Sequence, residues 1–181
     1  MKTNEELAME TYKKFGGSHF HMEREGVYKS YKKYNISKDQ EKKWDDEYIN
    51  ELIAGIKNKI IADEEYIKLL IALDRTVNTY FISIFIEIFK TNVNKMDTFS
   101  VLLISECTIK ILNSLILSCD KEKTKIALDF IKSIKLVLLN VADSTVVISP
   151  YFKNINHLKG MLSDKKIKLR ITDALNEINN L

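Results

Sequence analysis

Apolar residues recur along most of this chain with the spacing of α-helices, and the longest such stretch runs from Asp63 to Lys90. When residues are placed at about 100° per step, its polar side chains fall mainly on one narrow strip and the rest of the circumference is apolar. A helix of this kind belongs inside a domain, surrounded by other helices. The pattern therefore predicts one long, mostly buried helix, capped by Asp63, around which the rest of the chain is organised.

The same periodicity predicts helices on both sides of that stretch. They are expected over residues 3–15, 23–34, 37–62, 98–118, 120–141, 150–161 and 163–181. Residues 36–90 are expected to form a hairpin of two long helices, and residues 143–149 are the one segment in which a short strand would fit. The last helix carries an apolar seam that would pack on the body of the protein or on a second copy of the chain: Ile167, Ile171, Ala174, Ile178 and Leu181.

Chain length and turn residues limit the architecture further. A chain of 181 residues is long enough for one well-buried domain and short for two. Five glycines and one proline are few for the many turns of a β-sandwich or barrel, whereas a helical protein needs fewer turn-forming residues. We therefore predict an all-α protein with a single compact domain over residues 1–181, a bundle of about six to eight helices with a buried central helix. Residues 1–35 are expected to form short N-terminal helices and residues 36–181 the helical core.

The charge of the chain gives little indication of a partner. The net charge is +3, but only three of the 28 basic residues are arginine. The abundance of lysine, isoleucine and asparagine is typical of an AT-rich coding sequence, which raises lysine content without an anionic partner. Only residues 120–181 have a clear basic excess, whereas nucleic-acid binders usually show a denser cluster with more arginine.

The sequence also predicts where the protein resides. Its first residues are charged throughout and lack the apolar core of a signal peptide. Cys107 and Cys119 lie twelve residues apart in one apolar helical segment, too far along a helix axis to form a disulfide, and we interpret them as buried thiols in a reducing compartment. Charged residues interrupt every long apolar stretch, so no membrane span is expected. We predict a soluble cytoplasmic protein.

Asp74 and Asn78 fall on the apolar side of the predicted central helix. A buried carboxylate without partners costs several kcal/mol, so Asp74 must be paired, hydrogen-bonded, protonated or directed into a water-filled cavity. Two interpretations follow. The pair forms a structural polar network that fixes the packing of the bundle, which we favour, or it lines a pocket with a working carboxylate.

His19 and His21 are the strongest candidates for chemistry. Histidines on alternate residues of an extended segment point the same way, and with a carboxylate they suit zinc or another transition metal. A complete site needs a third or fourth ligand, for which the sequence offers no motif. A metal-dependent hydrolase or other small enzyme using His19, His21 and Asp74 is therefore an alternative hypothesis, and we expect neither a cofactor nor a resident metal.

Tyr28, Tyr31 and Tyr34 alternate with lysines between residues 28 and 43, as in proteins that bind single-stranded nucleic acid. A spacing of three residues also describes the buried edge of a helix. Acidic residues immediately downstream neutralise the segment. Nucleic-acid binding through this segment and the basic last third is therefore a second alternative, and we expect nucleic acid to be an unlikely partner.

No recognisable catalytic set is present, and helical bundles without one are most often interaction modules. We therefore predict a protein that binds another protein, such as an immunity protein, an inhibitor or a regulator of bacterial or phage origin, and we do not expect it to be an enzyme. The apolar seam makes a homodimer a further hypothesis. The candidate binding surface consists of aromatic and histidine residues that could anchor a partner: His19, His21, Tyr28, Tyr31, Tyr34, Trp44 and Tyr48.

Overall fold

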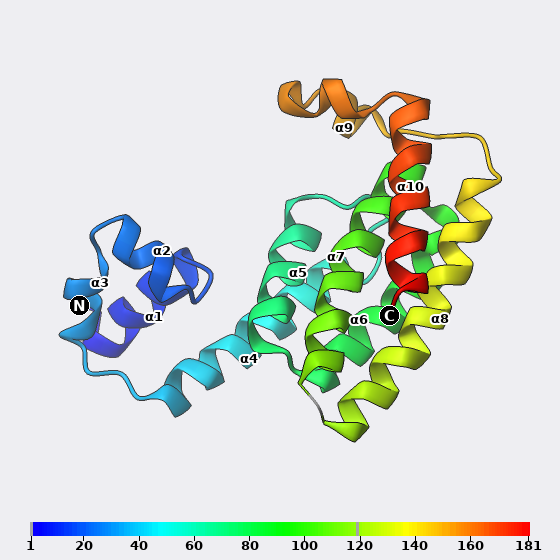
Figure 1. Cartoon of the computed structure of the whole chain (residues 1–181). Helices are drawn as coiled ribbons and strands as arrows, with labels where there is room; N and C mark the ends of the chain where they lie inside the picture. Colours follow the sequence, from blue (N-terminus) through cyan, green and yellow to red (C-terminus); the bar gives the residue numbers. More distant parts are fainter. Residues whose placement is uncertain (1, 119) are drawn as a thin grey trace. The chain divides into compact units, whose positions relative to one another are not determined.

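The computed structural model describes residues 2–118 and 120–181, and these ranges are helical, without a strand (Figure 1). The all-α prediction is therefore confirmed. Residues 143–149 contain no strand either; this segment is held to the start of the helix after residue 97, where the Thr98 amide donates to the Val147 carbonyl at 2.8 Å. Cys107 is half-buried and free, and Cys119 lies outside the described residues.

The chain forms two compact units, Met1–Ala54 and Gly55–Leu181. The first contains α1 (Asn4–Lys14), α2 (His19–Arg24), α3 (Tyr28–Lys32) and most of α4 (Lys38–Ile56). The second contains α5 (Glu64–Thr76), α6 (Thr79–Asn92), η1 (Val93–Lys95), α7 (Thr98–Leu117), α8 (Lys121–Ala142), α9 (Pro150–Lys153), η2 (Asn156–Met161) and α10 (Asp164–Asn179). The boundary between the units lies within α4, whereas the predicted boundary between the short N-terminal helices and the helical core lay after residue 35. The prediction that residues 1–181 form a single domain stays a prediction.

Local sequence signals position the helices of the first unit. Thr3 and Glu6 form a capping box at the start of α1, in which Glu6 N donates to Thr3 Oγ1 at 3.2 Å and Thr3 N donates to Glu6 Oε2 at 2.7 Å. After α1, Gly16 and Gly17 take positive φ angles of 56° and 71°, which are accessible to glycine at little cost. The chain can therefore turn sharply into α2.

The predicted continuous helix over residues 63–90 is wrong, because the chain turns between α5 and α6. Val77 takes a left-handed conformation, with φ 49° and ψ 37°, and ends α5. Asn78 then caps α6 by accepting a hydrogen bond from Tyr80 N at 3.1 Å. A β-branched residue in the left-handed region costs about 1 to 2 kcal/mol, so the turn is held by the packing of α5 on α7 and of α6 on α8 rather than by local preference.

The most enclosed of the described helices is α7, which packs against α5, α8 and α10. Twelve of its residues are buried. It is also the one described helix whose length and composition would allow it to cross a membrane, despite Glu106 and Lys110. Its burial in the second unit accounts for this composition, because a helix packed on most sides needs apolar residues on most sides.

The C-terminal helix α10 packs on α7 and α8 through the predicted seam. The seam residues Ile167, Ile171, Ala174 and Ile178 are all buried within the second unit, whereas Leu181 is 44% exposed. Arg170 adds a two-pronged ion pair with Glu106 of α7, at 2.9 and 2.5 Å. Of the two predicted uses of the seam, packing on the body of the protein is the one observed.

Candidate functional site

Most of the aromatic residues predicted to anchor a partner lie inside the first unit. Tyr31 is 4% exposed and Trp44 is 2% exposed. They form an aromatic core with Tyr12, whose ring stacks on Tyr31 with centroids 6.0 Å apart and lies 5.7 Å from the ring of Trp44. The prediction that Tyr31 and Trp44 are exposed anchors is wrong, because their spacing marks the inward face of α3 and α4.

A carboxylate that the sequence did not single out connects the helices around this core. Glu41 Oε1 accepts a hydrogen bond from Tyr31 OH at 2.7 Å and lies 2.8 Å from His19 Nε2. Burial and the adjacent Glu41 carboxylate raise the pKa of Tyr31 well above its usual value. Glu41 therefore ties α2 and α3 to α4. Asp45, one turn later, accepts a hydrogen bond from Tyr12 OH at 3.2 Å.

The two histidines do not form the pair that an extended segment would provide. Both lie in α2, where residues two apart point about 200° away from each other. His19 turns toward Glu41 and its ring lies 5.0 Å from that of Tyr28, whereas His21 is exposed. Among residues 2–118 and 120–181, no group of three His, Cys, Asp or Glu side chains is placed to hold a metal ion.

Of the remaining candidate residues, Tyr28 and Tyr34 pack against the edge of the aromatic core. Tyr28, Tyr34 and Tyr48 are half-buried. Lys32 Nζ lies 4.7 Å from the centroid of the Tyr28 ring, which is a cation–π contact. Because Tyr31 is enclosed and Tyr28 is already covered on one side, the three tyrosines do not form the open row of rings on which successive bases stack.

Replacing Glu41 by alanine should destabilise the first unit by about 1 to 2 kcal/mol, because the buried Tyr31 hydroxyl loses its acceptor. Trp44 is the only tryptophan and is buried in the same core, so its fluorescence reports unfolding of this unit. Urea titrations followed by that fluorescence measure the change. The double variant Glu41→Ala, Tyr31→Phe should recover part of the loss; no recovery would show that the hydroxyl is not the cause.

The buried network predicted for Asp74 and Asn78 is also wrong. Asp74 is exposed on α5 and Asn78 is half-buried as the cap of α6. The turn at Val77 changes the direction of the helix, so positions assigned to one apolar face no longer share it. Asp74 therefore needs no buried partner.

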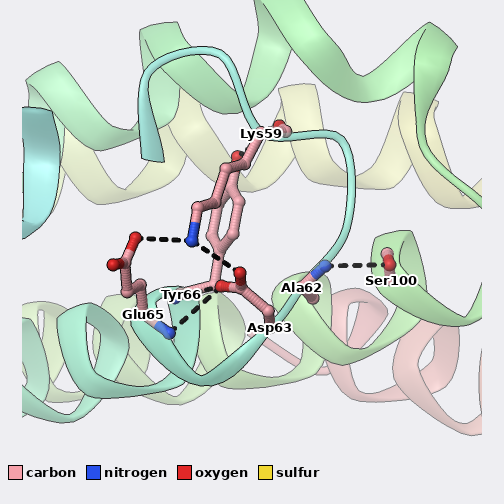
Figure 2. Close-up of polar contacts among 6 residues, drawn as sticks. All are labelled: Lys59, Ala62, Asp63, Glu65, Tyr66 and Ser100. Carbon is pink, nitrogen blue, oxygen red and sulfur yellow. Dashed lines mark hydrogen bonds and ion pairs between the residues drawn. The ribbon is translucent and has the colours of Figure 1, made fainter. Parts of the chain in front are cut away.

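A second polar network holds the loop between α4 and α5 (Figure 2). Lys59 Nζ forms ion pairs with Asp63 at 2.6 Å and Glu65 at 2.5 Å, and these hydrogen bonds raise the pKa of Lys59. Tyr66 OH donates to the Lys59 carbonyl at 3.3 Å. Ala62 N donates to Ser100 Oγ at 3.0 Å, which connects the loop to α7. The lysine is neutralised by two carboxylates, so this network is a structural clamp.

The exposed side of α8 differs from both networks, because its large apolar side chains face solvent. Leu128, Leu136 and Leu139 are 42%, 64% and 43% exposed and lie within about 80° of one another around the helix. Lys121 and Lys125 lie in the same sector. The sequence did not single out these leucines, since apolar residues of an amphipathic helix ordinarily belong to its buried face.

Comparison of the chain with protein-family models, with curated proteins and with solved structures found no match.

Proposed function

We propose that this chain is a protein-binding module and that the outer face of α8 is its docking surface. The observation that carries the proposal is the exposure of three leucines on one side of a helix whose other side is packed. Ala127, Ile131, Ile134 and Leu138 are the buried residues of α8. A helix needs only one apolar face to pack on its own domain, so a second apolar face indicates a second contact.

The charges around the leucines indicate which charge the partner should carry. Lys121, Lys125, Leu128 and Lys132 line a shallow hollow of about 420 Å³ along the first half of the face. Asp129 lies 3.6 Å from Lys132, whereas Lys121 and Lys125 have no carboxylate within ion-pair distance in the described part of the chain. A partner helix with apolar residues on one face and carboxylates beside them matches this arrangement.

Through this surface the protein would act as an immunity protein, an inhibitor or a regulator. We propose that it does so in the cytoplasm of a bacterium or of a phage-infected cell. We also propose that the helices form a bundle with α7 at its centre. A packed bundle holds α8 rigid and presents its outer face without rearrangement. Rigid presentation lowers the entropic cost of binding. A metal-dependent hydrolase at His19 and His21 is not proposed, since the two side chains diverge.

The test compares two tagged variants of the full chain as baits in a nuclease-treated extract of the native host. One changes Leu128, Leu136 and Leu139 to glutamine, and the matched control changes Leu169 of α10, which is 59% exposed, to glutamine. Because these side chains are exposed, each substitution should change stability by only about 0.5 kcal/mol. We expect one stoichiometric partner that the triple variant loses by tenfold or more (about 1.4 kcal/mol) and the control retains.

Two results would contradict the proposal. Retention of the partner by the triple variant would show that the partner binds a surface other than the outer face of α8. Loss of the partner by both variants would indicate binding through general apolar exposure and not through α8. If only the triple variant loses the partner, a photoreactive residue in place of Leu136 identifies the segment of the partner that contacts α8. We expect that segment to be helical and acidic.

A further inference from the structure

A groove of about 540 Å³ runs along the outer side of α6 in the second unit. It is lined by α6, by the beginning of the loop that follows α4 and by η1. This volume lies within the range of about 300 to 1000 Å³ that small-molecule sites occupy. The groove lies on a different helix from the proposed α8 surface and stands independently of it.

The floor of the groove is apolar. Ile84 and Ile88, one helical turn apart, are half-buried and line it. The hydroxyl groups beside them are directed to the helix backbone, since Ser83 donates to the Thr79 carbonyl and Thr91 donates to the Glu87 carbonyl, both at 2.8 Å. Their hydrogens are therefore not offered to a ligand, and the floor suits a hydrocarbon chain.

The rim of the groove is positively charged. Lys57 and Lys95 line it, and neither has a carboxylate within ion-pair distance in residues 2–118 and 120–181. The carboxylate in the lining, Glu87, is already paired with Lys90 at 3.0 Å. Asn92 donates to the Lys57 carbonyl at 3.0 Å, which fixes the backbone from which that lysine extends. The groove thus combines two available ammonium groups with an apolar floor.

We propose that this groove binds a single-chain amphiphile with an anionic head, the head between Lys57 and Lys95 and the tail along Ile84 and Ile88. Charge complementarity selects an anion over a cation or a neutral alcohol. The apolar floor selects a tail, because each methylene removed from water contributes about 0.8 kcal/mol. Carboxylate and phosphate heads share the chemistry that two lysines recognise.

The experiment measures binding of dodecanoate, dodecyl phosphate and dodecyltrimethylammonium to the delipidated full chain by calorimetry, below the concentrations at which each forms micelles. We expect saturable one-to-one binding of the anions, at least about tenfold tighter than that of the cation. The ratio between the two anions shows whether a fatty acid or a phosphate-headed lipid is the better ligand. Shortening the tail by two carbons should weaken binding roughly fivefold to fifteenfold.

The variants separate this site from unspecific adsorption. Lys57→Gln and Lys95→Gln should each weaken anion binding about threefold to tenfold, and Ile88→Ser should weaken every probe. Lys168→Gln is the matched control, because Lys168 is an exposed lysine of α10 outside the lining, and it should leave binding unchanged. Equal affinity for the cation, equal losses in Lys168→Gln, or no saturable anion binding would each overturn the proposal. Unchanged helical circular dichroism confirms that the exposed-lysine variants remain folded.

Discussion

Replacing Phe99 by alanine should lower the free energy of unfolding of Gly55–Leu181 by about 3 to 5 kcal/mol. Phe99 is 1% exposed at the start of α7. Its ring makes a T-shaped contact with that of Phe152 of α9, with centroids 4.8 Å apart, and the Arg170 guanidinium lies 5.4 Å from the centroid of the Phe99 ring. One side chain thus joins three helices, and its removal leaves a cavity that these separate segments cannot easily fill.

The measurement is a urea titration of the full chain followed by helical circular dichroism. Tyr151→Ala is the control, because Tyr151 is the neighbouring aromatic of α9 but is 42% exposed, and it should cost less than about 1 kcal/mol. A double-mutant cycle between Phe99 and Phe152 should give a coupling of about 0.5 to 1.5 kcal/mol. A loss below about 1 kcal/mol in Phe99→Ala would show that α9 and α10 do not depend on this contact.

Helix starts were the most predictable part of the fold, because a cap is a local interaction. Helices were expected to begin at residues 3, 63 and 120, and Thr3, Asp63 and Asp120 accept hydrogen bonds from the first turns of α1, α5 and α8 respectively. The helix expected from residue 150 likewise begins there as α9, with Ser149 as its cap and Pro150 in its first turn. In each case the side chain and its partner amides lie within three residues, so no information from the rest of the chain is needed.

The turn between α5 and α6 was missed for a physical reason. The apolar periodicity continues through it, since both helices use the same kinds of residue on their buried faces. Only Asn78 carried a signal, as a residue that caps helices well. The left-handed Val77 carried none, because a β-branched residue is among the least suited to that conformation and is held there by the packing of α5 on α7 and of α6 on α8.

The polar contacts of the candidate site were unpredictable in a different way. The spacing of Tyr28, Tyr31 and Tyr34 predicted either a stacking surface or a buried edge, and Tyr31 is buried. Its acceptor, Glu41, lies on the next long helix, ten residues away, among several other acidic residues. Nothing in the sequence distinguishes Glu41 from those neighbours, because the choice depends on how α3 lies against α4.

Stability of the second unit should fall steeply between pH 10 and pH 12, and Tyr66 should account for much of the fall. Tyr66 is fully buried, and burial raises its pKa from 10.0 to about 12. The folded state therefore holds this proton more tightly than the unfolded state. The resulting stability is complete below pH 10 and is lost as the pH rises to about 12, by up to about 3 kcal/mol. Lys59, whose pKa is also raised, acts in the same direction.

The test is to compare the free energy of unfolding of the parent chain and Tyr66→Phe at several pH values from neutral to alkaline. At neutral pH the variant should be less stable by about 1 to 2 kcal/mol, because the Lys59 carbonyl loses a hydrogen-bond donor. Between pH 10 and pH 12 its stability should fall less steeply than that of the parent. Tyr80→Phe is the matched control, since Tyr80 is 67% exposed, and it should keep the parental slope. An identical slope in Tyr66→Phe would mean that other groups, Lys59 first among them, carry the alkaline transition.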